Sequence, residues 1–150
     1  MPALRHSSQR NGSASLNPLT ANRPHMSKIF RVKEARKSTN PGVSDMYWLA
    51  DKELGATKMM AVLYEYQPNF STKRVHYHER RESAYIVLEG EAKIHLNGEE
   101  HLLHQGDATY LSPKDIHGVV GSGPKGLKMI EIWAPQDPDI VYLEDGKVVK

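Results

Sequence analysis

From Ile29 onward the chain is a succession of short apolar runs separated by turn residues, and this pattern constrains the fold more than any other feature. Each run is about four to eight residues long and rich in Val, Ile, Leu and Tyr, which is typical of β-strands. No segment sustains a helical period. The expected strands are 29–33, 46–50, 58–66, 74–78, 83–89, 91–96, 100–104, 107–111, 116–121, 127–133 and 139–143. The sequence therefore predicts an all-β domain.

Three dipeptides in this region are typical of tight turns between strands. Asn97-Gly98 is the strongest, because a two-residue type I′ hairpin turn needs positive φ at both central residues. Glu89-Gly90 and Asp145-Gly146 are weaker versions of the same pattern. Many short strands at regular spacing fit either a sandwich or a barrel, and the pattern alone does not choose between them.

Composition limits the chemistry that the chain can perform. The 150 residues suffice for one domain with its own core, and none of them is cysteine. A disulfide framework, a cysteine nucleophile, a zinc finger and an iron–sulfur cluster are therefore excluded, and any metal ion must be bound by His, Asp or Glu. No apolar run approaches the roughly 20 residues of a membrane helix, and no secretory signal is evident. We expect a soluble, cytoplasmic protein.

The first 27 residues differ from the rest, being rich in Ser, Asn, Pro and Arg without a hydrophobic period. We interpret residues 1–27 as a disordered N-terminal extension or tag and residues 28–150 as the barrel domain. The composition of the extension also resembles an organellar transit peptide. We favour vector-derived or upstream-translated sequence, with Met26 as the natural start.

The formal net charge of +2 arises in this extension, where residues 1–25 contain three arginines and no acidic residue. Without these three, 17 of the 20 basic residues remain against 18 acidic ones, so the body is nearly neutral. Nucleic acid is thus not an expected partner, because phosphate contacts need a clustered Lys/Arg surface. One local basic cluster is interpreted as a solvated loop next to the site; it consists of Lys73, Arg74, Arg80 and Arg81.

Three of the eight histidines lie in a pattern that suits metal binding. His76 and His78 are two residues apart on an expected strand, so their side chains lie on the same face about 6.6 Å apart and can reach one ion. Glu82 follows after an expected bend and would add an oxygen ligand, and His117 would arrive from a distant strand. The other histidines of the body, His95, His101 and His104, are expected to be ordinary surface or core residues.

These residues also carry a family resemblance. The stretch His76-x-His78-x3-Glu82-x7-Gly90 resembles the first motif of the cupin superfamily, and Gly106-Asp107-x5-Pro113-x3-His117 resembles the second. The resemblance implies a jelly-roll, or double-stranded β-helix, barrel. It further implies one divalent metal ion near one mouth of the barrel, bound by His76, His78, Glu82 and His117.

Three imidazoles and one carboxylate suit Fe, Mn, Ni, Co or Zn, and their affinity order does not select among these metals. Four protein ligands leave two positions of an octahedron for a small-molecule ligand, or for a ligand and dioxygen. Two classes of function follow. The chain is either a metalloenzyme acting on a small oxygenated molecule, as a dioxygenase or a sugar or keto-acid isomerase, or a non-catalytic module that binds or senses such a molecule.

Weaker candidates surround this expected site. Tyr64, Tyr110 and Trp133 either line a pocket or simply pack in the barrel. Glu131 lies between Ile130 and Ile132; if the two isoleucines face outward, Glu131 is an interior carboxylate and a candidate general base, and otherwise it is exposed to solvent. We also expect a homodimer formed by sheet-on-sheet packing, with Tyr85 and Val87 on the outer face.

Overall fold

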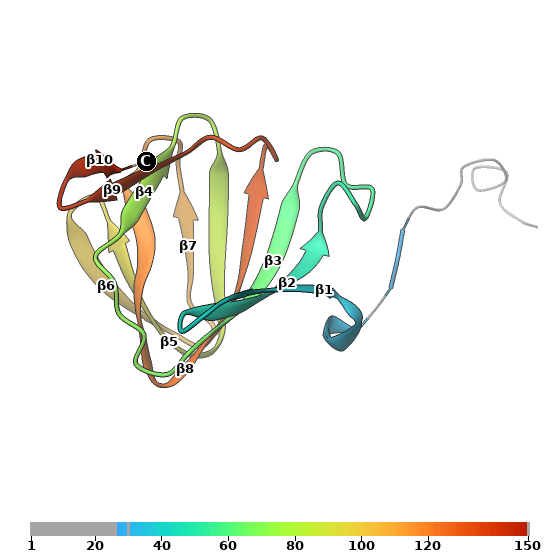
Figure 1. Ribbon diagram of the computed structural model, residues 1–150, viewed down its shortest axis with the longest axis horizontal. Helices are drawn as coiled ribbons and strands as arrows, with labels where there is room; N and C mark the ends of the chain where they lie inside the picture. The colour runs from blue at the N-terminus through green and yellow to red at the C-terminus, as the bar shows by residue number, and fades with distance from the viewer. Residues whose placement is uncertain (1–26, 30, 150) are drawn as a thin grey trace, which may run out of the picture.

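The computed structural model describes residues 27–29 and 31–149, and within them nearly all regular structure is β-strand (Figure 1). A single 3-10 turn, η1 (Val32–Glu34), precedes the strands. The strands are β1 (Arg36–Asn40), β2 (Ser44–Ala50), β3 (Met60–Tyr66), β4 (Val75–His78), β5 (Glu82–Leu96), β6 (Glu99–His104), β7 (Ala108–Leu111), β8 (His117–Ala134), β9 (Ile140–Glu144) and β10 (Lys147–Val149). The prediction of an all-β domain is confirmed. The extension expected at residues 1–27 lies outside the described residues, apart from Ser27.

The ten strands form one antiparallel sheet with two halves, because β5 and β8 are long enough to belong to both. The C-terminal part of β8 pairs with β3 and with the N-terminal part of β5, and β2, β1 and β7 extend this half. The N-terminal part of β8 pairs with β4 and with the C-terminal part of β5, and β9, β10 and β6 extend the other half. β5 and β8 curve together at the lower end of Figure 1. This is the expected jelly-roll barrel.

Two glycines permit the bends of β5 and β8. Gly90 has a φ of 78° and Gly126 a φ of 82°, a left-handed conformation that glycine adopts without steric cost. A Cβ atom on Gly90 would collide with the carbonyl oxygen of Gly126, and one on Gly126 would lie 2.7 Å from the carbonyl oxygen of Tyr66. Glu89-Gly90 is therefore a bend within one continuous strand, and the hairpin that we predicted there is wrong.

The other two turn predictions are confirmed. Asn97 and Gly98 have φ values of 49° and 94°, as a type I′ turn requires, and they connect β5 to β6. Asp145 and Gly146, with φ values of 48° and 75°, connect β9 to β10.

The observed strands differ from the expected ones in three ways. The expected strand 29–33 does not form as predicted, because its last two residues belong to the 3-10 turn η1. β1 was not predicted because its residues, RKSTN, are all polar, and β10 because it is only three residues long. The expected strands 83–89 and 91–96 form the single strand β5, and 116–121 and 127–133 lie within β8, because bends rather than turns connect them.

The apolar core lies between the two halves of the sheet. Its buried members are Tyr85, Val87, Ala92, Ile94, Leu111, Leu127 and Met129. Tyr85 and Val87 are thus interior residues, and the expectation that they form an outer patch is wrong; Ala84 and Ile86, which alternate with them, face outward. No helix in the described part of the chain has the length and apolar character needed to cross a membrane.

Candidate metal centre and cavity

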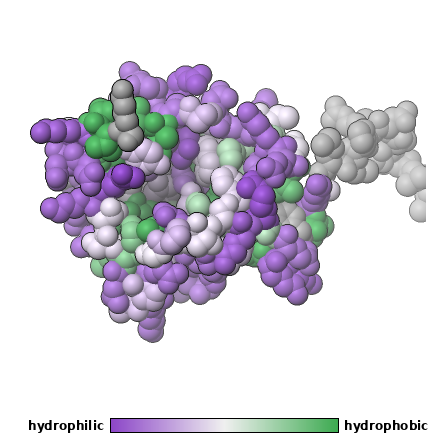
Figure 2. All heavy atoms as spheres, in the orientation of Figure 1, coloured by the Kyte–Doolittle hydropathy of each residue, from purple (hydrophilic) through white to green (hydrophobic). Residues whose placement is uncertain are grey.

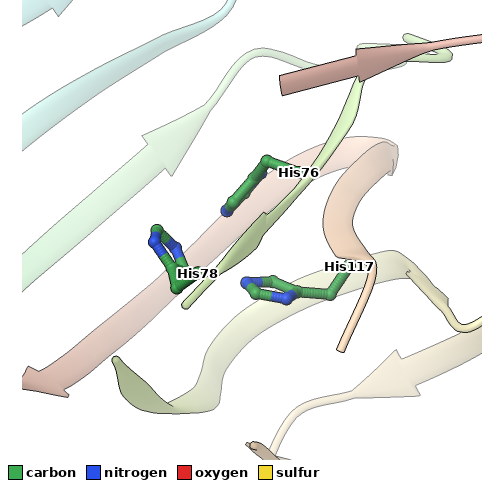
Figure 3. Close-up of side chains that lie close together, drawn as sticks. All are labelled: His76, His78 and His117. Carbon is green, nitrogen blue, oxygen red and sulfur yellow. The ribbon is translucent and has the colours of Figure 1, made fainter. Parts of the chain in front are cut away.

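Three histidine side chains converge at the β4–β8 side of the barrel. His76 and His78 lie two residues apart on β4, and the register places His117, the first residue of β8, opposite His76. Figure 3 shows the three imidazole rings pointing toward one another. One nitrogen of each ring lies within 4.8 Å of those of the other two. The structure therefore brings together three of the four ligands that the sequence predicted.

Two of these rings have one nitrogen engaged and the other free. His78 Nδ1 donates a hydrogen bond to Asp139 Oδ1 at 3.0 Å, and His117 Nδ1 donates to the carbonyl oxygen of Asp115 at 2.8 Å. Each Nε2 then keeps its lone pair, and both Nε2 atoms are buried without a hydrogen-bond partner among the described residues. A buried polar atom without a partner is costly, whereas metal-binding histidines use this arrangement routinely. The residues present fit a divalent metal ion.

The groups that orient the two rings are themselves held by hydrogen bonds. Asp139 also accepts a hydrogen bond from the backbone N–H of Arg80 at 2.9 Å. Asp115 accepts hydrogen bonds from Asn97 Nδ2 at 2.8 Å and from the backbone N–H of Ser112 at 2.9 Å. The turn between β5 and β6 thus helps to place the His117 ring, and the segment before β9 places the His78 ring.

The three imidazoles are held in the neutral form that binds metal ions. Burial, together with the nearby His117 and His78, lowers the pKa of His76 to about 2. Burial and the Arg81 guanidinium lower the pKa of His78 to about 4, although Asp139 opposes this shift. Burial also lowers the pKa of His117. The site therefore keeps its lone pairs at a pH at which a solvated histidine would be protonated.

Glu82, the fourth predicted ligand, is not part of this group. It is the first residue of β5 and its side chain is exposed, because it lies on the outer face of the strand. The next residue, Ser83, is buried and faces the interior. A difference of one residue in the phase of a strand places a side chain on the opposite face of the sheet.

A cavity of about 440 Å³ adjoins the three histidines, and His76 forms part of its wall. Glu131 lies inside this cavity, 6% exposed, and accepts a hydrogen bond from Arg81 Nη2 at 2.8 Å. The Arg81 guanidinium also lies over the ring of Trp133, 4.4 Å from its centroid. The cavity thus combines a candidate metal-binding wall with a buried ion pair.

The protonation of Glu131 is set by two opposing effects. Burial raises the pKa of its carboxyl group, while the charge and hydrogen bond of Arg81 act in the opposite direction. The hydroxyl groups of Tyr64 and Ser83 also favour the charged form. The net effect is a raised pKa, which brings the carboxyl group closer to the range in which it can both accept and release a proton.

The structure separates the weaker sequence candidates. Ile130 and Ile132 face outward, so Glu131 is the interior carboxylate of the two alternatives. Tyr64 lines the cavity, whereas Tyr110 is 61% exposed on the outer face and does not. Trp133 is buried and packs on Arg81.

Two residues of the site were not found by sequence reasoning. Arg81 was assigned to a solvated loop, yet its side chain is only 13% exposed and lies in the cavity. It alternates with Ser83 and Tyr85, so the correct phase of β5 would have identified it as an interior residue. Asp139 lies outside both histidine motifs, and no pattern in the sequence points to it.

Comparison with known proteins agrees with this architecture. The model of the cupin domain family matches residues 62–133, a range that includes all three histidines. The chain therefore contains a cupin domain.

Similar solved cupin structures include a polyketide cyclase, RemF from Streptomyces resistomycificus, which is 27% identical with a TM-score of 0.65 over 81% of this chain and 89% of that one. KdgF from Halomonas sp. is 25% identical with a TM-score of 0.63, over 74% of this chain and 96% of that one. A curated relative, mannose-1-phosphate guanylyltransferase RfbM of Salmonella typhimurium, is 30% identical over 70 residues, 45% of this chain. The match spans only 15% of the length of that relative.

Proposed function

We propose that this cupin is a metalloenzyme that binds one divalent metal ion through His76, His78 and His117 and transfers protons on a small oxygenated molecule in the adjoining cavity. The observation that carries this proposal is the position of Glu131. A buried carboxyl group with a raised pKa lines the same cavity as His76, and His76 converges with the two histidines whose Nε2 atoms have no partner among the described residues. Perturbed titratable groups that converge in a cavity are typical of active sites.

The three imidazoles suit Fe, Mn, Ni, Co or Zn, and such an ion supplies Lewis acidity that polarises a carbonyl or enediol oxygen. Glu131 would take a proton from the carbon adjacent to the carbonyl group and return it at a neighbouring atom. Arg81 holds the Glu131 carboxylate in position through the bond at 2.8 Å. Trp133 in turn supports the guanidinium from one side.

Of the candidate reactions, this arrangement favours isomerisation or cyclisation over oxygen insertion. Proton transfer at carbon needs a buried general base next to the substrate, and Glu131 meets this need. Dioxygen activation would use the metal ion but would not require the interior carboxylate of Glu131. The similarity to RemF, a polyketide cyclase, also favours cyclisation over oxygen insertion.

The test is proton exchange followed by NMR. Wild-type protein without a tag would be incubated in D2O with a panel of ketoses, 2-keto acids and 1,3-diketones, and loss of the C–H signal next to the carbonyl would be followed. We expect at least one compound to exchange, and Glu131→Gln to slow this by about 100-fold or more while metal content is unchanged. Glu65→Gln, a change on the same sheet outside the barrel interior, is the matched control.

Other outcomes separate the alternatives. Oxygen consumption by the iron-loaded protein, without exchange, would overturn the proposal in favour of a dioxygenase. Saturable binding of a panel compound with neither exchange nor oxygen consumption would favour a non-catalytic binding module.

We also propose a homodimer, formed by the outer face of the β3–β8–β5–β7 half. Cross-strand pairs there place apolar side chains next to one another; they include Ala84, Ile86, Tyr110, Ile130 and Ile132. Sedimentation should give about twice the chain mass of 16.9 kDa, and Ile130→Lys should give the single-chain mass. A wild-type mass near 16.9 kDa at micromolar concentration would contradict this assembly.

A further inference from the structure

Two residues of opposite charge line the cavity without forming an ion pair. Arg74 and Glu144 both contribute to its wall. The register of β4 and β9 pairs Val75 with Leu143, so Arg74, just before Val75, lies beside Glu144, just after Leu143. Within the described part of the chain, neither residue forms an ion pair with the other or with any other side chain.

The Arg74 guanidinium is instead held by an aromatic ring. It lies 5.3 Å from the centroid of the Tyr142 ring, and the same ring lies 5.8 Å from that of His76. The Tyr142 ring therefore lies next to both Arg74 and His76. A cation over an aromatic face is oriented by the ring but keeps its N–H donors for another partner.

The second arginine of the cavity, Arg81, differs from Arg74 in that it forms an ion pair. The charge of Arg81 is compensated by Glu131 at 2.8 Å, and both side chains are buried. Arg74 is exposed and uncompensated at the cavity wall. Of the two guanidinium groups, Arg74 is thus the one able to bind an incoming anion.

We propose that Arg74 binds an anionic oxygen group of the molecule that enters the cavity, a carboxylate or a phosphate, and that Glu144 weakens this binding through repulsion. This rests on the proposed function only in that the anion belongs to the substrate of the same site. The planar guanidinium offers paired N–H donors that match both groups. Arg74 thereby selects anionic over neutral oxygenated molecules.

The test uses three small probes: acetate, its neutral isostere acetamide, and methyl phosphate. Each would be titrated into the full-length, 15N-labelled protein at constant ionic strength, with the Arg74 Nε–H resonance and the backbone amides of Val75 and Leu143 as reporters. Acetate or methyl phosphate should give saturable shifts, and neutral acetamide should give none. The anion that saturates at the lower concentration identifies the carboxylate or the phosphate as the preferred group.

Two variants should change the affinity of that anion in opposite directions. Arg74→Gln should weaken binding at the amide reporters by about fivefold or more, as expected for a partly exposed ion pair. Glu144→Gln should strengthen binding by about twofold, because it removes a nearby negative charge. Lys73→Gln removes an exposed positive charge one residue away that does not line the cavity, and should leave the affinity unchanged.

The proposal is overturned if acetamide shifts the reporters as the anions do, if the anion-dependent shifts occur at Arg81 and not at Arg74, or if Arg74→Gln and Lys73→Gln act alike. None of these measurements requires turnover. A failure here therefore leaves the proposed proton transfer standing, and a failure of the exchange experiment leaves the anion site standing.

Discussion

Two groups of histidines in the same barrel differ sharply in their surroundings. His76, His78 and His117 converge on the cavity side, and Nε2 of His78 and His117 is buried without a partner. His101 and His104, on β6, have side chains 47% and 59% exposed. Their Nε2 atoms lie 3.7 Å from Glu99 and 3.8 Å from Glu91, respectively.

The difference lies in what occupies the second nitrogen and in what covers the ring. His78 and His117 each donate Nδ1–H to a fixed acceptor, so the free lone pair points in a defined direction. The β6 histidines face water, which can satisfy either nitrogen in any orientation. Convergence, burial and a fixed tautomer, rather than the number of histidines, make the first group a candidate metal site.

The largest effect that should separate the two groups is on metal affinity. Replacing His76, His78 or His117 by alanine removes one of three converging ligands and should weaken zinc binding by more than about 100-fold. His101→Ala and His104→Ala should leave the affinity unchanged. Calorimetric titration of metal-free protein measures all five variants, and circular dichroism confirms that the barrel persists. Loss of affinity in a β6 variant would show that the two groups had been confused.

A smaller effect is expected from the acceptor that orients His78. Asp139→Asn replaces the carboxylate at 3.0 Å from His78 Nδ1 by an amide, and should weaken zinc binding by about tenfold. Asp137→Asn, two residues away on the same segment, is the control and should have no effect. Equal affinities in the two variants would mean that Asp139 does not orient the ring.

Burial of the His78 ring should also couple folding to pH. The folded pKa of His78 is about 4, against about 6.5 in the unfolded chain, so between these values only the unfolded chain binds the proton. The free energy of unfolding of metal-free protein should therefore fall as pH decreases from about 6.5 to about 4. Urea titrations at several pH values should show a shallower decline in His78→Gln than in the wild-type protein. An unchanged decline in His78→Gln would contradict the assigned burial.

The smallest effect is expected at Glu82. Because its side chain is exposed on the outer face, Glu82→Gln should change zinc affinity by less than about twofold. A loss comparable to that of His117→Ala would restore Glu82 to the ligand set and would require β5 to begin in a different phase.

Much of the fold followed from local patterns in the sequence. The short β-rich runs predicted the all-β domain, Asn97-Gly98 predicted a hairpin, and the spacing of the histidines anticipated their convergence. β1 was missed because a polar edge strand is ordered by pairing with β2 and has no apolar pattern of its own.

The errors within the site have one physical cause. The sequence alone does not reveal at which residue after His78 the strand β5 begins. A shift of one residue in that start places every side chain of the strand on the opposite face of the sheet. The same phase error placed Glu82 in the site, moved Tyr85 to the surface and left Arg81 in a solvated loop. On β8 both faces carry apolar residues, so alternation could not decide whether Glu131 faced inward.

The most direct test of the metal centre is anomalous diffraction from crystals of the untagged protein grown with zinc. We predict one strong anomalous peak, which marks a zinc ion about 2.0–2.1 Å from one nitrogen of each of His76, His78 and His117. Nε2 should be the bonded atom in His78 and His117, with Nδ1 still on Asp139 and on the carbonyl oxygen of Asp115. A peak at His101 or His104 with none at the three converging histidines would contradict this account of the site.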